Sequence, residues 1–353
     1  MKEVIILGRG IAGLVLSYLL EKAGVDHLVL SRKEEVSPVA LGETIPPSAM
    51  PLLHDAGLFE FFKSSSFGKT SGYHSQWGSD RVTDHHFYQQ GTEAHGLKID
   101  KAKLVQQLSQ LQQHRLVEIK ALKAITEAKD TGHVTIIDQS GEQFKGRMWV
   151  DATGRKRAGL KLSGIAETRH DEQVAFACHL PGRAFKQLPY GVFMESFADG
   201  WGIVSTLDAN RNVMTLFTAA KNPELSRFRK YADWPVLLKD TTGLRFFLSD
   251  QVTPKVLGYD ASTSFPAKVA GKNWLAIGDA AMAFDPLSSH GITNAIWTAN
   301  RAADLIRDAV VSPEAPLQTA QYQQQINRIF DGYAKARQQL YEQKWQWENA
   351  QAV

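Results

Sequence analysis

The chain has 353 residues, 43% of them hydrophobic, and a formal net charge of +3 at pH 7, enough to bury a large core in about two domains. So small a charge gives no support for nucleic-acid binding. The only cysteine, Cys178, excludes an intramolecular disulfide framework and a cysteine-ligated zinc site. It lies in an apolar run, so we expect a buried, inert thiol. The N-terminus lacks a signal-peptide pattern, and no apolar run of about 18 residues predicts a membrane span. We expect a soluble, cytoplasmic protein.

The first thirty residues predict a strand, a glycine loop, a helix and a second strand. Residues 2–7 are an apolar run with β-branched side chains, and the sequence G-R-G-I-A-G follows at 8–13. An apolar helical stretch comes next, and residues 27–30 form the second strand. In this setting the G-x-G-x-x-G pattern indicates a dinucleotide-binding unit.

Each glycine of this loop has an expected role. Gly8 allows the tight turn, Gly10 lets a pyrophosphate approach the backbone, and Gly13 lets helix and strand pack closely. At the start of the helix, Ile11 and Ala12 contribute N–H groups that can hold the phosphate charge.

One position departs from the dinucleotide pattern. The second strand usually ends in Asp or Glu, which holds a ribose hydroxyl, but here it ends in Ser31, followed by Arg32. Ser31 can still hydrogen-bond a ribose, and Glu34 or Glu35 are alternatives that the sequence leaves open. We therefore expect the nucleotide to be retained less tightly than in a protein with an acid at position 31.

Helical signals follow this unit. We expect a helix from Ser48 towards Leu58, a loop over the Ser-, Gly- and Lys-rich residues 63–72, strand-like structure over 73–88, and a helix capped by Asp100.

The middle of the chain is rich in predicted strands. Residues 134–137 and 147–150 flank the hairpin-like turn D-Q-S-G, and residues 117–119 precede them. A β-rich section covers roughly 171–260 and is interrupted by a helical patch near 223–250. Its expected strands lie at 176–180, 190–196, 201–207 and 213–218.

Towards the C-terminus, residues 274–277 form a buried strand that runs into Gly278 and Asp279. A loop at 284–291 leads to a long helix that begins at Ile292. The tail, about 316–348, has apolar residues at helical spacing and predicts one or two amphipathic helices. These helices could dock a partner or cover the sheet, and we favour the second role.

Three stretches, at 8–13, 151–154 and 278–291, each place a glycine-containing turn after a strand. An acid just after a strand can hold a polyol hydroxyl, and a helix N-terminus can stabilise negative charge on an electron-rich ring. This combination resembles the FAD-dependent hydroxylases of the p-hydroxybenzoate hydroxylase type and their relatives, the tryptophan halogenases.

The resemblance implies an FAD site and an α/β, Rossmann-like FAD-binding fold with an inserted mixed β-sheet and a C-terminal helical tail. It assigns residues 1–170 and 261–310 to a discontinuous FAD-binding domain, 171–260 to a β-rich substrate domain and 311–353 to the C-terminal helices. Besides the glycine loop, Ser31 and Arg32, the implied FAD-binding residues are Gly278, Asp279, Pro286, Gly291 and Ile292.

A narrower resemblance rests on G-E-T-I-P-P at 42–47, W-G-S-D at 77–80 and D-P-L-S-S-H-G-I-T at 285–293. These segments look like the modifying flavoproteins of tryptophylquinone enzymes, which are encoded beside amino-acid oxidases such as glycine or lysine oxidase. The resemblance implies a monooxygenase whose partner is an oxidase precursor and whose product is a hydroxylated tryptophan side chain, formed on the way to cysteine tryptophylquinone.

Other functions stay open. Lys69 lies eight residues before Trp77, a spacing similar to that of the catalytic lysine of halogenases, but position 288 is Ser where halogenases carry Glu. Their W-x-W-x-I-P stretch is also missing, the nearest segment being W-G-I-V at 201–204. A small-molecule aromatic hydroxylase and a non-catalytic flavin-binding chaperone of the oxidase are the remaining alternatives.

The candidate catalytic residues are His290, Glu43 and Lys69. His290 should lie beside the flavin and could remove a proton near neutral pH or merely stabilise its loop. Glu43 could bind substrate or cap the following helix. The pair His85-His86 lacks helical ligand spacing, so we expect no metal site. NAD(P)H is a possible reductant, although no second G-x-G-x-x-G exists.

Overall fold

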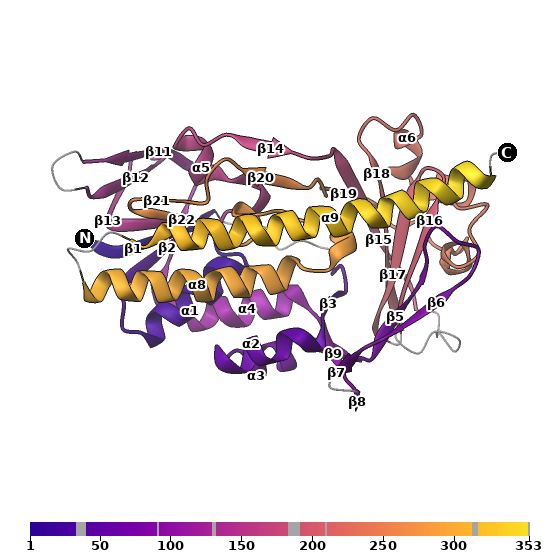
Figure 1. Ribbon diagram of the computed structural model, residues 1–353, viewed down its shortest axis with the longest axis horizontal. Coiled ribbons are helices and arrows are strands. Elements are labelled where there is room, and N and C mark those ends of the chain that lie inside the picture. Colours follow the sequence, from indigo (N-terminus) through magenta and orange to yellow (C-terminus); the bar gives the residue numbers. More distant parts are fainter. Residues whose placement is uncertain are drawn as a thin grey trace.

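A computed structural model describes residues 1–32, 40–89, 92–128, 132–182, 191–208, 210–312 and 317–351 (Figure 1). Glu34 and Glu35, which we considered for the ribose, lie outside the described residues. Two large sheets stand at opposite ends of the long axis, and helices pack beside the first of them (Figure 1).

The first sheet has eight strands in the order β10-β2-β1-β13-β12-β11, with β22 beside β13 and β21 beside β22. Strands β10, β2, β1, β13 and β22 run parallel, so their carboxyl ends meet at one edge, as in a dinucleotide-binding fold. The strands are β1 (Lys2–Leu7), β2 (His27–Arg32), β10 (Leu116–Ile119), β11 (Leu122–Glu127), β12 (Val134–Asp138), β13 (Gln143–Asp151), β21 (Ala270–Gly271) and β22 (Trp274–Ala276).

Helices cover this sheet because their apolar faces need a partner. Helix α1 (Ile11–Lys22) packs against α8 (Gly291–Val311), and α4 (Lys101–Leu111) packs against α1. As predicted, Asp100 caps α4 by accepting a 3.0 Å hydrogen bond from the backbone N of Lys103. The helix expected from Ser48 to Leu58 is broken: Gly57 has φ 69° and separates α2 from α3. The short helices are α2 (Met50–Asp55), α3 (Phe59–Ser64) and α5 (Ala158–Leu162).

The second sheet has seven strands in the order β19-β15-β18-β17-β16-β5-β6. This sheet contains the strands that we predict over 176–180, 201–207 and 213–218. The strand predicted over 190–196 begins at Tyr190, which is outside the described residues. Because β5 and β6 join from the N-terminal half, we propose that they belong to the substrate region as well. The strands are β5 (Gly72–Gln76), β6 (Thr83–His86), β15 (Gln173–Pro181), β16 (Val192–Phe197), β17 (Gly200–Asp208), β18 (Arg211–Ala219) and β19 (Leu257–Asp260).

The core beside this sheet is aromatic. Two short helices, α6 (Leu225–Phe228) and α7 (Trp234–Leu237), form the predicted helical patch and bury Phe228 and Trp234 completely. Trp201 stacks on Phe217 with ring centroids 3.8 Å apart, so Trp201 is a packing residue. Cys178 is buried, as predicted, in the cluster that contains Phe228 and Trp234.

A separate three-stranded sheet, β3-β9-β4, is formed by segments between residues 43 and 99. The prediction of a loop over 63–72 was wrong, because β4 pairs with β9, opposite Leu97 and Gly96. The Ser-, Gly- and Lys-rich composition of this segment is typical of a loop, but the segment forms a strand because the paired strand β9 supplies the apolar residues. The strands are β3 (Glu43–Ile45), β4 (Ser66–Thr70) and β9 (Gly96–Ile99), and two small pairs are β7 (Tyr88–Gln89) with β8 (Thr92–Glu93) and β14 (Glu167–Arg169) with β20 (Ser264–Pro266).

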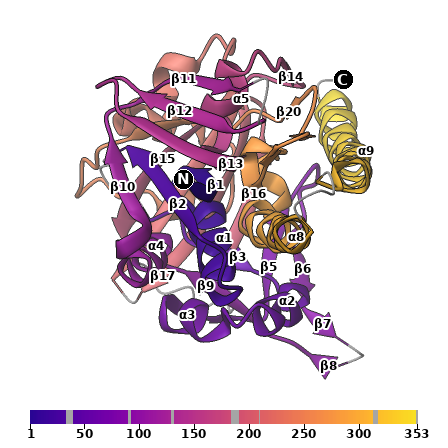
Figure 2. The same ribbon diagram turned by 90° about the vertical axis from the view of Figure 1, so that its left-hand side faces the viewer.

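The tail is one helix, α9 (Thr319–Gln351), which runs along the outside of the molecule from the first sheet to the second (Figure 1). Viewed from the end, α8 and α9 lie on the same side of the molecule (Figure 2). Tyr322 donates a 2.7 Å hydrogen bond to the carbonyl of Ala276, and Trp77 donates a 2.8 Å bond to the carbonyl of Leu340. Helix α9 therefore contacts the regions of both large sheets. In the described ranges, no helix combines the length and apolar character needed to cross a membrane.

Candidate functional site

The glycine loop lies between β1 and α1, and its three glycines meet different surroundings. Gly8 has φ 108°, and a Cβ there would lie 2.5 Å from the carbonyl oxygen of Ala152. A Cβ on Gly13 would lie 2.0 Å from the carbonyl oxygen of Gly8, whereas one on Gly10 would meet nothing within 4 Å. Gly8 and Gly13 are thus required by the packing of the chain itself, and Gly10 leaves an open side for a ligand.

The N-terminus of α1 faces this open side without a side-chain cap. Gly10 is the N-cap residue, and the first turn, which begins at Ile11 and Ala12, contains no acidic residue. The N–H groups of such a turn carry partial positive charge and can bind an anion. The geometry therefore fits the phosphate-holding role that we predict for the loop.

The end of β22 brings the second glycine turn against the first. Gly278 has φ 59°, and a Cβ there would lie 2.9 Å from the Cβ of Ala12. The backbone N of Ile277 donates a 2.9 Å hydrogen bond to Asp151, and Ala152 donates a 2.8 Å bond to Leu7. Three predicted stretches, separated by more than a hundred residues of sequence, therefore meet at one sheet edge.

Asp151 serves its own turn rather than a ligand. Its carboxylate accepts hydrogen bonds from the backbone N (2.9 Å) and hydroxyl (2.6 Å) of Thr153 and from the backbone N of Leu160 (2.8 Å). The side chain is fully buried, and burial raises its pKa. Asp151 thus stabilises the turn behind the glycine loop.

Asp279 is more open. Its side chain is 32% exposed, and one carboxylate oxygen lies 3.5 Å from Nε of Arg155. Arg155 also donates a 2.6 Å hydrogen bond to the carbonyl of Phe284, so it joins Asp279 to the next loop. Because Asp279 keeps an accessible carboxylate after a strand, it remains our candidate for holding FAD hydroxyls.

A buried arginine that the sequence did not single out supports this turn from behind. Arg157 donates hydrogen bonds to the carbonyls of Asp279 (3.1 Å) and Ala280 (3.0 Å), and its Nη1 lies 2.7 Å from Glu167. Burial lowers the pKa of Arg157, but Glu167 and the carbonyls compensate its charge. Nothing local in the sequence marks Arg157, because the carbonyls that it binds belong to residues more than a hundred positions away.

The loop at 284–291 presents its functional candidates outward. Pro286, His290 and Gly291 are exposed, whereas Ile292 is buried in the first turn of α8. Ser289 has φ 53°, and the backbone N of His290 donates to the Ser288 hydroxyl (3.3 Å). His290 is the N-cap residue of α8 without a side-chain cap bond, so its imidazole is available to a ligand at the surface.

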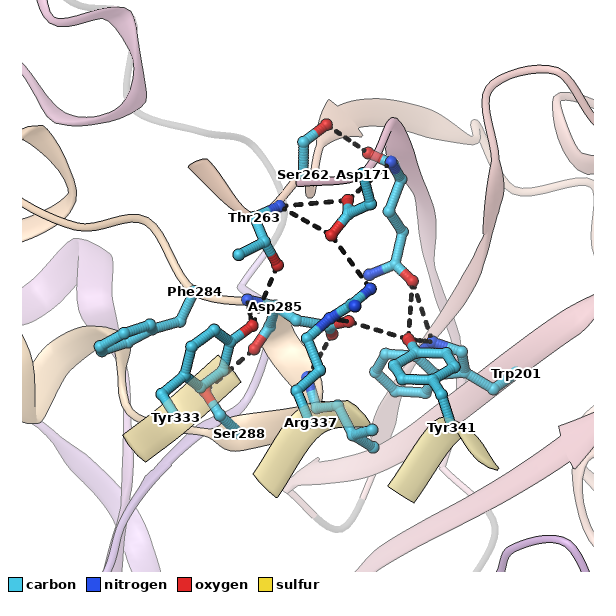
Figure 3. A network of polar contacts seen from close by, with 12 residues as sticks. Asp171, Trp201, Ser262, Thr263, Phe284, Asp285, Ser288, Tyr333, Arg337 and Tyr341 are labelled. Carbon is cyan, nitrogen blue, oxygen red and sulfur yellow. Dashed lines mark hydrogen bonds and ion pairs between the residues drawn. The ribbon is translucent and has the colours of Figure 1, made fainter. Parts of the chain in front are cut away.

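Behind the loop, Asp285 is held by α9 (Figure 3). Its buried carboxylate caps the Pro286–Ser288 turn by accepting from the backbone N of Leu287 (2.9 Å). The same carboxylate lies 3.0 Å from Nε of Arg337 and accepts a 2.8 Å hydrogen bond from the Tyr341 hydroxyl. Helix α9 thus fixes the loop expected to face the flavin.

The same α9 residues reach the second sheet (Figure 3). Nη2 of Arg337 lies 3.0 Å from Asp171, which comes two residues before β15, and the Tyr341 hydroxyl lies 2.9 Å from Gln173, the first residue of β15. Burial opposes a charge on Arg337, but Asp285 and Asp171 raise its pKa overall. The sequence predicted a helix here, but not that it carries this polar network.

Glu43 and Lys69 lie on the outer strands of the β3-β9-β4 sheet. One carboxylate oxygen of Glu43 is buried and has no hydrogen-bond partner among the described residues, and the other lies 3.9 Å from Nζ of Lys101. Lys69 is exposed and pairs with Leu97 across β4 and β9. Between them on β9, the buried Lys98 donates a 3.0 Å hydrogen bond to the carbonyl of Gly191.

Ser31 and Arg32 end β2. The Ser31 hydroxyl donates a 3.0 Å hydrogen bond to the carbonyl of Arg32, and its side chain is buried. Arg32 is exposed and lines a cavity of about 280 Å³ together with Glu118, Ile119 and Lys120 of β10 and its end. The carboxyl ends of β2 and β10 thus form a hollow beside the glycine loop. No group of three or more potential metal-ligating side chains occurs in the described part of the chain.

Comparison with known proteins agrees with this geometry. Residues 1–158 match the family of FAD binding domains. LodB of Marinomonas mediterranea, named as an FAD-dependent oxidoreductase, is 26% identical over 359 residues, which cover 98% of this chain and 94% of LodB.

Two solved structures share the fold. The peptidyl tryptophan dihydroxylase QhpG, described as essential for tryptophylquinone cofactor biogenesis, aligns with a TM-score of 0.72 and 20% identity, over 97% of this chain and 75% of QhpG. The flavin-dependent brominase Bmp2 aligns with a TM-score of 0.77 and 17% identity, over 99% of this chain and 90% of the brominase.

The fold and the convergent glycine turns define a flavoprotein with a Rossmann-like FAD-binding domain. More narrowly, the chain is similar over nearly its whole length to an FAD-dependent oxidoreductase, and it shares its fold with a peptidyl tryptophan dihydroxylase and a flavin-dependent halogenase. The predicted resemblance and the predicted α/β fold with a helical C-terminal segment are confirmed.

The residues present fit FAD. Gly10 has open space where a Cβ would be, and Thr293, in the first turn of α8, carries a buried hydroxyl oxygen with no hydrogen-bond partner in the described part of the chain. Such oxygens are normally satisfied, which indicates a missing polar ligand. When bound, FAD supplies the redox chemistry, because its reduced ring activates dioxygen. The roles of the individual residues towards FAD stay predictions.

Proposed function

We propose that this flavoprotein is a monooxygenase that hydroxylates a tryptophan side chain in the precursor of a quinone-cofactor amino-acid oxidase. The observation that carries the proposal is the similarity to LodB over nearly the full length of both chains. It is supported by a shared fold with QhpG, which is named as a peptidyl tryptophan dihydroxylase. Indole is electron-rich, so oxygen transfer to it needs positioning more than a strong base.

The loop at 284–291 supports a protein-borne substrate. Pro286, Ser289 and His290 are all exposed, so a polypeptide segment has access to this side of the predicted flavin site. A site for a small free aromatic substrate would gain from enclosure, which excludes water from the reacting ring. An open approach therefore favours a substrate whose own chain covers the site.

Glu43 and His290 have complementary roles in this proposal. The unpartnered carboxylate oxygen of Glu43 is a hydrogen-bond acceptor, and indole N–H is a donor only. Glu43 would therefore orient the ring. His290 would accept the proton that leaves the ring carbon after oxygen transfer, which suits an imidazole near neutral pH. NAD(P)H is the proposed reductant.

The direct test is to combine the FAD-loaded protein, NADPH, isotopically labelled dioxygen and the purified oxidase precursor. We expect labelled oxygen on a tryptophan-containing peptide of the precursor, found by mass spectrometry. His290→Gln should lower this yield at unchanged FAD affinity, whereas the exposed His54→Gln should not. Precursor that binds but stays unmodified would refute hydroxylation and favour a chaperone.

A halogenase is the second candidate, because Lys69 has the halogenase spacing to Trp77 and the fold is shared with a brominase. This function predicts halide-dependent modification of free indole or pyrrole. Lys69→Ala should then abolish the halogenated product, whereas Lys63→Ala, another exposed lysine close by in the sequence, should not. Oxygenation of the precursor that is unaffected by Lys69→Ala would exclude a role for this lysine.

A further inference from the structure

The acid that Ser31 lacks is found on the neighbouring strand. In the parallel pairing of β10 with β2, Glu118 is the register partner of Ser31. Side chains of register partners project to the same face of a sheet. Ser31 itself uses its hydroxyl hydrogen on the carbonyl of Arg32, whereas the side chain of Glu118 is 53% exposed.

The carboxylate of Glu118 reaches towards the glycine loop. Its Oε1 lies 3.4 Å from Nη1 of Arg9, the residue between Gly8 and Gly10. Arg9 follows β1, and β2 lies between β1 and β10 in the sheet. The Glu118 side chain therefore spans the carboxyl end of β2, where an acid at position 31 would lie.

The hollow beside Glu118 has the composition of a nucleoside site. It measures about 280 Å³ and is lined by Arg32, Glu118, Ile119 and Lys120. In doubly wound sheets, nucleotides bind outside the carboxyl ends of the strands. Glu118 offers acceptors for hydroxyl groups, and Ile119 with the two cationic side chains offers surface for a base.

We propose that Glu118 binds the ribose hydroxyls of the FAD adenosine, so that β10 supplies the acid that is absent from β2. The proposal rests on FAD being the cofactor of this site. The proposal also gives the small side chain of Ser31 a role, because it leaves room for Glu118 to lie across the end of β2. The wild type would then retain FAD despite Ser31, and weak retention would be expected only in variants that lack the Glu118 carboxylate.

The test measures flavin affinity and needs no turnover. The apoprotein is titrated with FAD and, separately, with FMN, which lacks the adenosine, and binding is followed by flavin fluorescence. Glu118→Gln and Glu118→Ala should weaken FAD binding about tenfold to a hundredfold, the loss of a charged hydrogen bond, and leave FMN binding unchanged. Glu142→Gln, at an exposed glutamate in the β12–β13 turn, is the matched control.

Two further measurements separate direct binding from an indirect effect. An FAD analogue whose adenosine ribose has no free hydroxyls should bind the wild type and Glu118→Gln equally. In an Arg9→Gln background, Glu118→Gln should still weaken FAD binding, because its partner is the ribose rather than Arg9.

Unchanged FAD affinity in both Glu118 variants would overturn the proposal, as would equal losses for FAD and FMN or the absence of any loss in the Arg9→Gln background. A wild-type protein that binds neither FAD nor FMN would instead refute the assignment of FAD as the cofactor, and this outcome is distinguishable from a failure of the Glu118 proposal.

Discussion

Arg337 places its Nε 3.0 Å from the carboxylate of Asp285, a side chain with no solvent exposure. The pair joins the outer helix α9 to the loop that we expect to face the flavin. A buried carboxylate depends on such a partner, because an uncompensated charge inside a protein is strongly unfavourable.

We therefore expect Arg337→Gln to destabilise the protein by about 3–5 kcal/mol, the usual cost of removing one member of a buried ion pair. Urea unfolding at neutral pH measures this change. The control is Arg307→Gln, which removes an exposed pair with Asp304 at 3.0 Å and should cost at most about 1 kcal/mol. Equal effects of the two substitutions would show that α9 does not support the loop through this pair.

The glycine loop allows folding and flavin binding to be separated. Gly13→Ala places a methyl group 2.0 Å from the carbonyl of Gly8, so we expect the apoprotein to lose about 1–3 kcal/mol by overpacking. Gly10→Ala meets no protein atom within 4 Å, so its apoprotein should melt close to the wild type and yet bind FAD poorly. Thermal unfolding and flavin titration test both. Full FAD affinity in Gly10→Ala would exclude a pyrophosphate at this position.

Lys98 gives a pH-dependent prediction. Burial lowers its pKa from 10.5 to about 8, so between these values the unfolded chain binds more protons than the folded protein. Stability contributed by this group therefore rises with pH across that window, by about 3 kcal/mol in total. Below pH 8 the contribution is constant.

The measurement is the unfolding free energy of the wild type minus that of Lys98→Met, from pH 7 to 10.5. The difference should move in favour of the wild type as the pH rises. Lys123→Met, at an exposed lysine of β11, should give a flat difference. A flat profile for Lys98→Met as well would mean that the folded lysine titrates like an exposed one.

Cys178 should be unreactive in the native state. Burial raises the pKa of its thiol to about 12, and the thiolate is the reactive form. At pH 8, a chromogenic disulfide reagent should label the folded protein negligibly and release one equivalent once urea unfolds it, since the chain has a single cysteine. Labelling of the native protein as fast as of the unfolded chain would contradict the buried position.

Local signals were enough to predict the first βαβ unit, the Asp100 cap and the long helix after His290. Each depends on periodicity or on turn residues within a few positions. The contribution of Arg157 and Arg337 could not be predicted, because their partners lie far away in the sequence. The pairing of Ser31 with Glu118 is likewise a property of the assembled sheet, which no local pattern contains.

The sequence motifs of the flavin site end well before helix α9, which the folded protein needs to hold the last of them in place. Every glycine turn of the flavin site is synthesised by residue 291, yet Asp285 binds Tyr341 and Arg337, and Ala276 binds Tyr322. Chains emerge from the ribosome N-terminus first. The nascent protein therefore carries the complete set of predicted flavin motifs before α9 can hold their last loop in place, and we expect cofactor capture to be a late event in its biosynthesis.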